Sequence, residues 1–223
     1  MKYKAIILDL DDTLYDYASL NDAAIERSVT MAHDKCMVPK ESFMDAFLWA
    51  REETKKVLNE TGACHNRMLY FQKALEHLGI PPVISAIDLY ECYWGYMLEH
   101  MQLNYGALEF LQYCKYHSAK IGICSDLTAH IQHRKIRRLG IAHLIDAIVT
   151  SEEAGVEKPH LQMFGMILSK LGVAASEALY IGDSYKKDVV GAEGAGIDVL
   201  WYKGKEEDNR SIRSFFEALE KLV

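Results

Sequence analysis

Hydrophobic and polar positions follow two different rhythms along this chain. A short run of apolar and β-branched residues at about 4–10 is bounded by polar residues, which predicts a buried strand. Beyond it, as far as about residue 103, apolar positions recur at helical spacing and no segment predicts a strand. The helices expected in this stretch cover about residues 18–33, 40–58, 66–78 and 85–102. Consecutive helices can bury their apolar faces against one another, so this stretch is expected to form a bundle.

After about residue 104, short apolar runs alternate with helical segments. Strands are expected at 120–124, 145–149, 178–181 and 197–201, and helices at 106–117, 128–139, 160–171, 185–195 and 211–222. This alternation predicts right-handed βαβ units and a parallel sheet, which the first strand must join because it has no other partner. The predicted fold is therefore an α/β core of the doubly wound, Rossmann-like class with an inserted all-helical cap domain. The core is expected to comprise residues 1–15 and 104–223, and the cap residues 16–103.

Composition narrows the class of protein. Half of the 223 residues are hydrophobic, and the net charge of −7 argues against binding to a nucleic acid polymer. The five cysteines form no C-x-x-C pair, which is typical of a reduced, cytoplasmic chain. The first residues lead straight into a strand without a signal peptide, and no apolar run approaches the length of a membrane span. Nothing in the sequence implies a protein partner, so a monomer or weak homodimer is expected.

Polar groups follow the predicted strands at the points where the strands end. They are Asp9 and Asp11, then Ser125, then Lys158-Pro159, and finally Asp183 with Asp188 five residues later. In a parallel α/β sheet, ligands bind beyond the carboxyl ends of the strands, so these groups are expected to converge. Asp9 and Asp11 point the same way from an extended chain, and like charges that close repel unless a proton or cation lies between them. Carboxylates, a hydroxyl and an ammonium gathered in one place suit phosphoryl transfer with Mg²⁺.

A single acidic pair after a strand is also typical of turn formers and helix caps. The complete series is more specific. The order D-x-D-x-T, S, K-P and G-D-x-x-x-x-D, from Asp9 to Asp188, resembles the haloacid dehalogenase superfamily of phosphohydrolases. The stretch 151–159 is similar to the same stretch in members that act on nucleotides and other small phosphomonoesters. The helical insert resembles the small, C1-type cap of one subgroup of the superfamily. Asp11 argues against the dehalogenases of the superfamily, which resemble D-x-Y at these positions.

The resemblance implies a role for each matching side chain. Asp9 matches the nucleophile, and Asp11 the general acid and base. Ser125 is expected to donate a hydrogen bond to a phosphoryl oxygen. Lys158 is expected to offset the charge of nucleophile and phosphate. Thr13 matches the position that steadies the loop after the first strand.

The same resemblance implies a bound Mg²⁺ as cofactor. Its expected ligands are a carboxylate oxygen of Asp9, the main-chain carbonyl of Asp11 and the carboxylate of Asp183. Asp188 matches the second acidic position, which acts through metal-bound water or by orienting Lys158.

Substrate contacts are expected from Thr13, Ser125, Asp126 and Arg67. Asp126 stands where many relatives have Asn, and a carboxylate near a phosphate is unfavourable unless it points away or is paired. Arg67 is the candidate from the insert for a phosphate or sugar contact, although arginines there are more often simple surface residues. The basic segment with His130, His133, Arg134, Lys135, Arg137 and Arg138 is expected to be a solvated helix face.

These features together predict a Mg²⁺-dependent phosphomonoester hydrolase that acts on a small phosphorylated metabolite. The resemblance favours a nucleoside 5′-monophosphate as substrate, followed by a sugar phosphate. Two alternatives stay open. One is a phosphomutase similar to β-phosphoglucomutase, and the other is a binding or regulatory protein that kept the fold and lost turnover.

Overall fold

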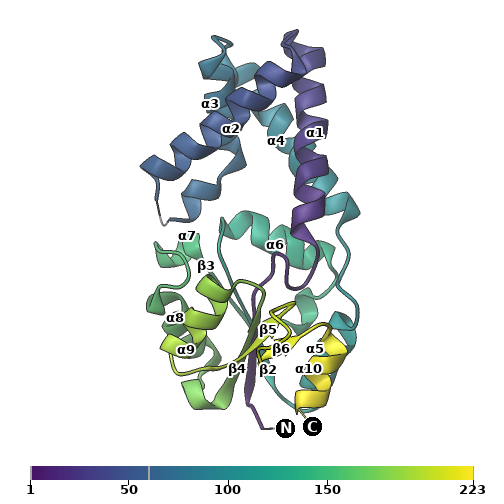
Figure 1. Ribbon diagram of the computed structural model, residues 1–223, viewed down its shortest axis with the longest axis vertical. Coiled ribbons are helices and arrows are strands. Elements are labelled where there is room, and N and C mark those ends of the chain that lie inside the picture. Colours follow the sequence, from purple (N-terminus) through teal and green to yellow (C-terminus); the bar gives the residue numbers. More distant parts are fainter. Residues whose placement is uncertain (1, 60, 223) are drawn as a thin grey trace. The chain divides into compact units, whose positions relative to one another are not determined.

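The computed structural model describes residues 2–59 and 61–222. The chain folds into two compact units, drawn in Figure 1: one comprises Met1–Asp16 with Gln102–Val223, and the other is Tyr17–Met101. The first is called the core unit and the second the helical unit. No helix in the described part of the chain is both long enough and apolar enough to cross a lipid bilayer.

The core unit is built on a six-stranded sheet in the order β3-β2-β1-β4-β5-β6, with every neighbouring pair parallel. Its strands are β1 (Ala5–Leu8), β2 (Lys120–Ser125), β3 (Ala147–Thr150), β4 (Ala178–Gly182), β5 (Asp198–Tyr202) and β6 (Ser211–Ile212). This confirms the predicted doubly wound α/β core. All four residues of β1 are buried, as expected for a central strand covered on both faces.

Helices cover both faces of this sheet (Figure 1). Helices α5 (Ala107–Tyr116) and α10 (Phe215–Leu222) lie on one face, and α8 (Leu161–Leu171) and α9 (Val190–Gly194) on the other. Under α8, Phe164 and Ile167 pack with Tyr180 and Val149 of the strands, all fully buried. The remaining helices of the unit are α6 (Ala129–Arg138) and the short α7 (Ser151–Ala154), and 3-10 turns lie at Ala142–Leu144 and Ala175–Glu177.

Two elements of the core unit differ from those predicted. The expected helix 211–222 begins only at Phe215, because Ser211 and Ile212 pair with Trp201 and Tyr202 as the edge strand β6. The expected helix 185–195 opens with a wider π-helical turn, Tyr185–Val189, before α9. The strand β6 forms by pairing with β5, and helical periodicity does not report such pairing.

The helical unit contains α1 (Tyr17–Cys36), α2 (Lys40–Val57), α3 (Arg67–His77) and α4 (Ala86–His100). Short 3-10 segments, η1 (Gly62–His65) and η2 (Pro82–Ile84), precede α3 and α4. Its core is rich in aromatic rings. Phe47 packs against Phe71 with ring centroids 5.2 Å apart, and Tyr93 against Trp94 at 4.9 Å. Fully buried rings account for how a bundle of this size encloses a core of its own.

Candidate functional site

Three carboxylates gather at the carboxyl edge of the sheet. Asp9 directly follows β1, Asp183 directly follows β4, and Asp188 comes from the π-helical turn. One oxygen from each lies within 4.8 Å of the others. Asp9 is 6% exposed and Asp188 fully buried, so water screens their mutual repulsion poorly. Such a cluster needs positive charge close by.

Lys158 supplies part of that charge. Its Nζ donates to an oxygen of Asp9 at 2.8 Å and to one of Asp188 at 2.6 Å. It also donates to the Tyr180 hydroxyl at 3.2 Å, which itself donates to Asp188 at 2.9 Å. Lys158 is 4% exposed, so its position is fixed by these partners. One ammonium against three carboxylates still leaves an excess of negative charge.

The titration behaviour of the acids reflects this excess. Burial, together with the nearby carboxylates, raises the pKa of Asp9 to about 8 although Lys158 opposes the shift. Burial and the charge of Asp188 raise the pKa of Asp183 to about 6. Ionised carboxylates are held here against an electrostatic cost, which a divalent cation relieves. Several hard oxygen atoms at short mutual distances are the donor set that Mg²⁺ prefers, so the residues present fit such an ion.

Local chain geometry places Asp183 and Asp188. A Cβ on Gly182 would lie 2.5 Å from Oδ2 of Asp188, so only glycine lets the carboxylate approach the end of β4. The Ser184 amide donates to Asp188 at 3.0 Å. Asp183 receives a hydrogen bond from Thr13 at 3.2 Å, and its main-chain carbonyl receives one from the Trp201 indole at 2.7 Å. Thr13 therefore links the loop after β1 to the loop after β4.

Asp11 lies in a separate network. Lys135 donates to both of its carboxylate oxygens, at 2.6 and 2.8 Å, and the Tyr15 hydroxyl donates at 2.6 Å. Gln132 makes a longer contact of 3.5 Å. Burial raises the pKa of Asp11, but Lys135 outweighs this effect and holds the carboxyl below its usual value. Asp11 is thus ionised and oriented by side chains of α6 and of its own loop.

Gln132 also fixes the end of β2. Its amide nitrogen donates to the Ser125 hydroxyl oxygen at 2.8 Å and to the Asp126 carbonyl at 2.8 Å. Ser125 is 1% exposed. The hydroxyl can therefore direct its own proton elsewhere while Gln132 occupies one of its lone pairs.

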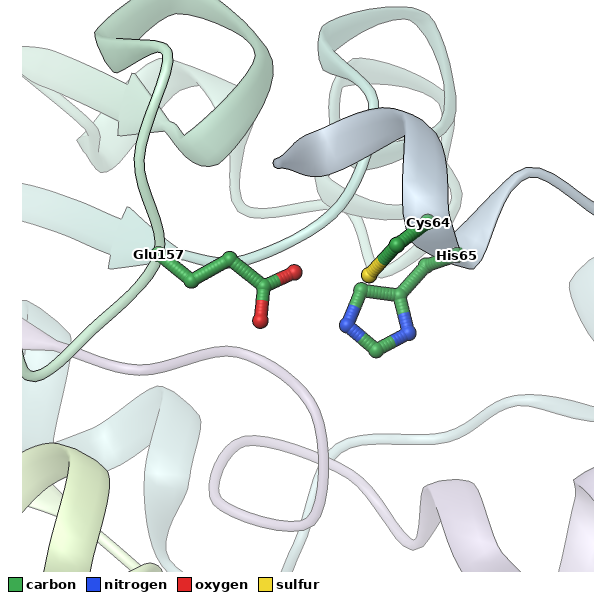
Figure 2. Close-up of side chains that lie close together, drawn as sticks. All are labelled: Cys64, His65 and Glu157. Atoms are coloured by element: carbon green, nitrogen blue, oxygen red, sulfur yellow. The ribbon is translucent and has the colours of Figure 1, made fainter. Parts of the chain in front are cut away.

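The charge of Asp126 is compensated within the protein. Its Oδ1 accepts from the main-chain amide of Lys158 at 3.0 Å, and its Oδ2 from the ammonium of Lys187 at 2.7 Å. Figure 2 shows Glu157 extending from the loop that precedes Lys158, and its carboxylate also accepts from Lys187, at 3.2 Å. The unfavourable charge foreseen at Asp126 is offset in this way, and the side chain holds the Lys158 loop. Cys64 and His65, also labelled in Figure 2, belong to η1 of the helical unit.

The solvated face expected for the basic residues of helix 128–139 is wrong at one position. Lys135 is fully buried, whereas His130, His133, Arg134, Arg137 and Arg138 are exposed. Gln132, which was not part of that prediction, is fully buried as well. The spacing along the helix could have indicated this burial, because Gln132 and Lys135 share a helix face with the apolar Ile131 and Ile136. Their contacts with Asp11 and Ser125 were not foreseen. Neither were those of Tyr180 and Trp201.

The structure therefore brings together most of the residues picked out in the sequence. Asp9, Asp183, Asp188 and Lys158 form one cluster, with Thr13 bonded to its edge. Asp11 and Ser125 are joined to each other through Gln132. Arg67 belongs to the helical unit, where it begins α3.

Comparisons with known proteins identify similar sequences and folds. A family model described as haloacid dehalogenase-like hydrolase matches residues 6–202. Ribulose-1,5-bisphosphate 5-phosphatase from Halopiger xanaduensis is 38% identical over 210 residues, 92% of this chain and 87% of that protein. Glyceraldehyde 3-phosphate phosphatase from Methanopyrus kandleri is 31% identical over 214 residues, 92% of this chain and 86% of that protein. The magnesium-bound hydrolase YfnB from Bacillus subtilis superposes with a TM-score of 0.72 at 22% identity, covering 100% of this chain and 99% of that one. At that identity the likeness to YfnB shows the fold alone.

Proposed function

The chain belongs to the haloacid dehalogenase-like hydrolase family and is a phosphatase, and we propose that it hydrolyses a small sugar phosphate through an aspartyl-phosphate on Asp9. One observation carries the proposal. The Lys158 ammonium contacts the Asp9 carboxylate at 2.8 Å, within a cluster that still has excess negative charge. A nucleophile held beside a fixed cation is the arrangement that accepts a phosphoryl group.

Mg²⁺ is the proposed cofactor. The carboxylates of Asp9, Asp183 and Asp188 and the main-chain carbonyl of Asp11 would hold it. When bound, the ion supplies positive charge that offsets the carboxylates and the transferring phosphoryl group. The charge excess and the raised pKa values of Asp9 and Asp183 support this assignment.

In the first proposed step, an oxygen of Asp9 attacks phosphorus and the bond from phosphorus to the ester oxygen breaks. The leaving alkoxide takes a proton from the carboxyl group of Asp11, so that the products are an alcohol and the aspartyl-phosphate. Lys158 and the hydroxyl of Ser125 stabilise the charge on the phosphoryl oxygens. Asp11 must be protonated for this step, although Lys135 favours its ionised form.

In the second step, a water molecule attacks the phosphorus of the aspartyl-phosphate. Asp11, now ionised, takes a proton from that water as the bond to Asp9 breaks, which releases inorganic phosphate and restores both carboxyl groups to their starting states. The ion pair with Lys135 suits this half of the cycle, because it stabilises the carboxylate that acts as the base.

The substrate class rests on the relatives. The two described above are named for ribulose 1,5-bisphosphate and glyceraldehyde 3-phosphate, both phosphorylated sugars. We therefore place a small sugar phosphate ahead of a nucleoside 5′-monophosphate, which the sequence alone had favoured. Both compounds are small phosphomonoesters, so the same site chemistry applies to either.

The test is phosphate release from a panel of sugar phosphates and nucleoside monophosphates, with Mg²⁺ and with EDTA. The Asp9→Asn variant should lose at least about 10⁴-fold in turnover while keeping the melting temperature, because it removes the nucleophile and conserves the volume. Asp198→Asn is the matched control, since Asp198 begins β5 at the opposite edge of the sheet.

Full activity in Asp9→Asn would rule out the proposed intermediate. If no compound releases phosphate while Mg²⁺ still binds, the hydrolase proposal fails. Phosphoryl exchange between two positions of a sugar would then identify a phosphomutase, and its absence a protein without turnover.

A further inference from the structure

Arg67 is a buried cation in the helical unit. It occupies the first position of α3 and is 8% exposed. Arginine is almost never buried to this extent unless it is paired with an acid. Yet none of the ion pairs among residues 2–59 and 61–222 includes Arg67. Its charge is therefore not neutralised by a described carboxylate.

The groups that accept hydrogen bonds from the Arg67 guanidinium or stack on it are neutral. Its Nη1 donates to the carbonyl of His65 at 2.7 Å, and its Nη2 donates to the Tyr17 hydroxyl. The Tyr17 hydroxyl in turn donates to Asn21 at 3.0 Å. The rings of Tyr70 and Trp94 lie 5.3 and 6.0 Å from its Cζ. Figure 2 shows His65 beside Cys64 on η1, the segment that leads into Arg67. A guanidinium has five N–H donors, so these partners leave some of them available.

A cavity opens beside this guanidinium. Its volume is about 70 Å³, and it is lined by Tyr17, Asn21, Ile25, Phe47, Arg51, Arg67 and Tyr70. That exceeds the ~10–15 Å³ needed to hold one water molecule. The lining contains two arginines and no acid. Arg51 has only a long contact of 3.9 Å with the exposed Glu52, and such surface pairs contribute little.

We propose that this cavity is an oxyanion site in the helical unit, which binds a phosphate or sulfate group between Arg51 and Arg67. Guanidinium groups bind tetrahedral oxyanions with paired N–H donors, and Asn21 and the tyrosine hydroxyls can contact the remaining oxygens. A bound anion would add an opposite charge beside the buried Arg67 guanidinium, whose present partners are hydroxyl, carbonyl and aromatic groups. The anion proposed for this cavity is a free phosphate or sulfate ion.

Fluorine NMR of the full chain labelled with 5-fluorotryptophan tests the site directly. The chain has three tryptophans. Trp94 is buried beside Arg67, whereas Trp201 donates to the carbonyl of Asp183 in the core unit. Sodium sulfate is titrated in EDTA at constant ionic strength. The Trp94 resonance is expected to shift with saturation, and Trp201 serves as the internal monitor of anion binding at the catalytic edge.

Arg51→Met is the main variant, because Arg51 is 44% exposed and its loss need not unfold the bundle. It should weaken the sulfate-dependent shift of Trp94 at least about tenfold, as expected for loss of a charge-assisted contact. Arg27→Met, at an exposed arginine of α1, is the matched control and should leave the titration unchanged. Arg67→Met should abolish the shift if the variant folds.

Two results would overturn the site. One is a Trp94 resonance that does not move over the whole titration. The other is a Trp94 shift whose midpoint sulfate concentration is the same in Arg51→Met and Arg27→Met, because general ionic effects would then explain the shift.

Discussion

At the scale of single residues, the ion pair between Lys135 and Asp11 joins positions 124 residues apart. The ammonium is fully buried and contacts both carboxylate oxygens of Asp11. Burial raises the pKa of Asp11, and the Lys135 charge more than reverses that effect. Lys135 therefore sets both the orientation and the protonation state of the proposed acid and base.

Replacing this lysine tests that role. In Lys135→Met, kcat should fall about 10- to 100-fold, a typical share of general acid–base catalysis. The pKa of Asp11 should rise, because a stabilising positive charge is lost, so the limb of the kcat profile that Asp11 controls should move to higher pH. Loss of a buried charged partner should also lower the free energy of unfolding by about 1–3 kcal/mol. The measurements are kcat against pH and urea unfolding.

The matched control for this experiment is Arg134→Met, an exposed position one residue away on α6. It should change neither quantity. If Lys135→Met lowers the stability but leaves the pH profile of kcat unchanged, Lys135 has a structural role and does not control the protonation of Asp11.

At the scale of elements, the junction between β4 and the π-helical turn decides where the acids lie. Gly182 ends the strand, and its missing side chain makes room for the carboxylate of Asp188. The turn then returns Asp188 beneath the Ser184 amide. Periodicity predicted a regular helix starting at the same place, whereas the structure opens that helix with the wider turn that carries Asp188.

Gly182→Ala should disrupt the junction. The added Cβ lies 2.5 Å from Oδ2 of Asp188, so the carboxylate must move. The expected cost is about 1–3 kcal/mol in unfolding free energy, typical of overpacking, together with weaker Mg²⁺ binding. Urea unfolding and calorimetric titration with Mg²⁺ measure the two effects.

Gly165→Ala is the control for this variant. Gly165 lies within α8, and a Cβ there meets no heavy atom within 4 Å. Alanine should stabilise that helix by up to about 1 kcal/mol and leave Mg²⁺ binding unchanged. Equal behaviour of the two variants would show that Gly182 has no special role.

At the scale of the whole molecule, the acidic cluster ties stability to pH and to metal. An acid whose pKa is raised on folding binds more protons in the folded state than in the unfolded one, so its contribution to stability falls as pH rises. For Asp183 this window runs from about pH 4 to about 6, and for Asp9 from about pH 4 to about 8. Lys158, whose pKa is raised well above its usual value, adds no change in this range.

Mg²⁺ should reverse that loss. Because the ligands must release protons to bind the ion, the rise in melting temperature caused by Mg²⁺ over EDTA should be larger at pH 8 than at pH 6. Asp183→Asn should remove part of the difference between the two pH values, since it deletes one titrating ligand while Asp9 still titrates up to about pH 8. Thermal melts of both proteins at fixed Mg²⁺ concentration provide the measurement. An equal shift at both pH values would contradict the assignment of these acids as ligands.

The class of fold and the polar groups at the strand ends could both be predicted without coordinates. Burial on both faces of β1 requires an unbroken apolar run, and a polar group directly after a parallel strand must lie at the ligand-binding edge. That is why Asp9, Ser125 and Asp183 could be placed near one another without a structure. Helical spacing located α1–α4 for the same reason, since their apolar faces repeat every three to four residues.

Only the tertiary structure decided which charges are paired. The sequence pattern predicts Lys135 to be one of several exposed basic residues of a helix, whereas the structure buries it against Asp11. From the sequence, the Asp126 carboxylate is expected to be unfavourable near a phosphate. In the structure its charge is paired with Lys187, 61 residues away along the chain. Ser211 and Ile212 become a strand only because β5 presents an unpaired edge to them. Pairing across such separations depends on three-dimensional distance, whereas periodicity and motifs report only what lies along the chain.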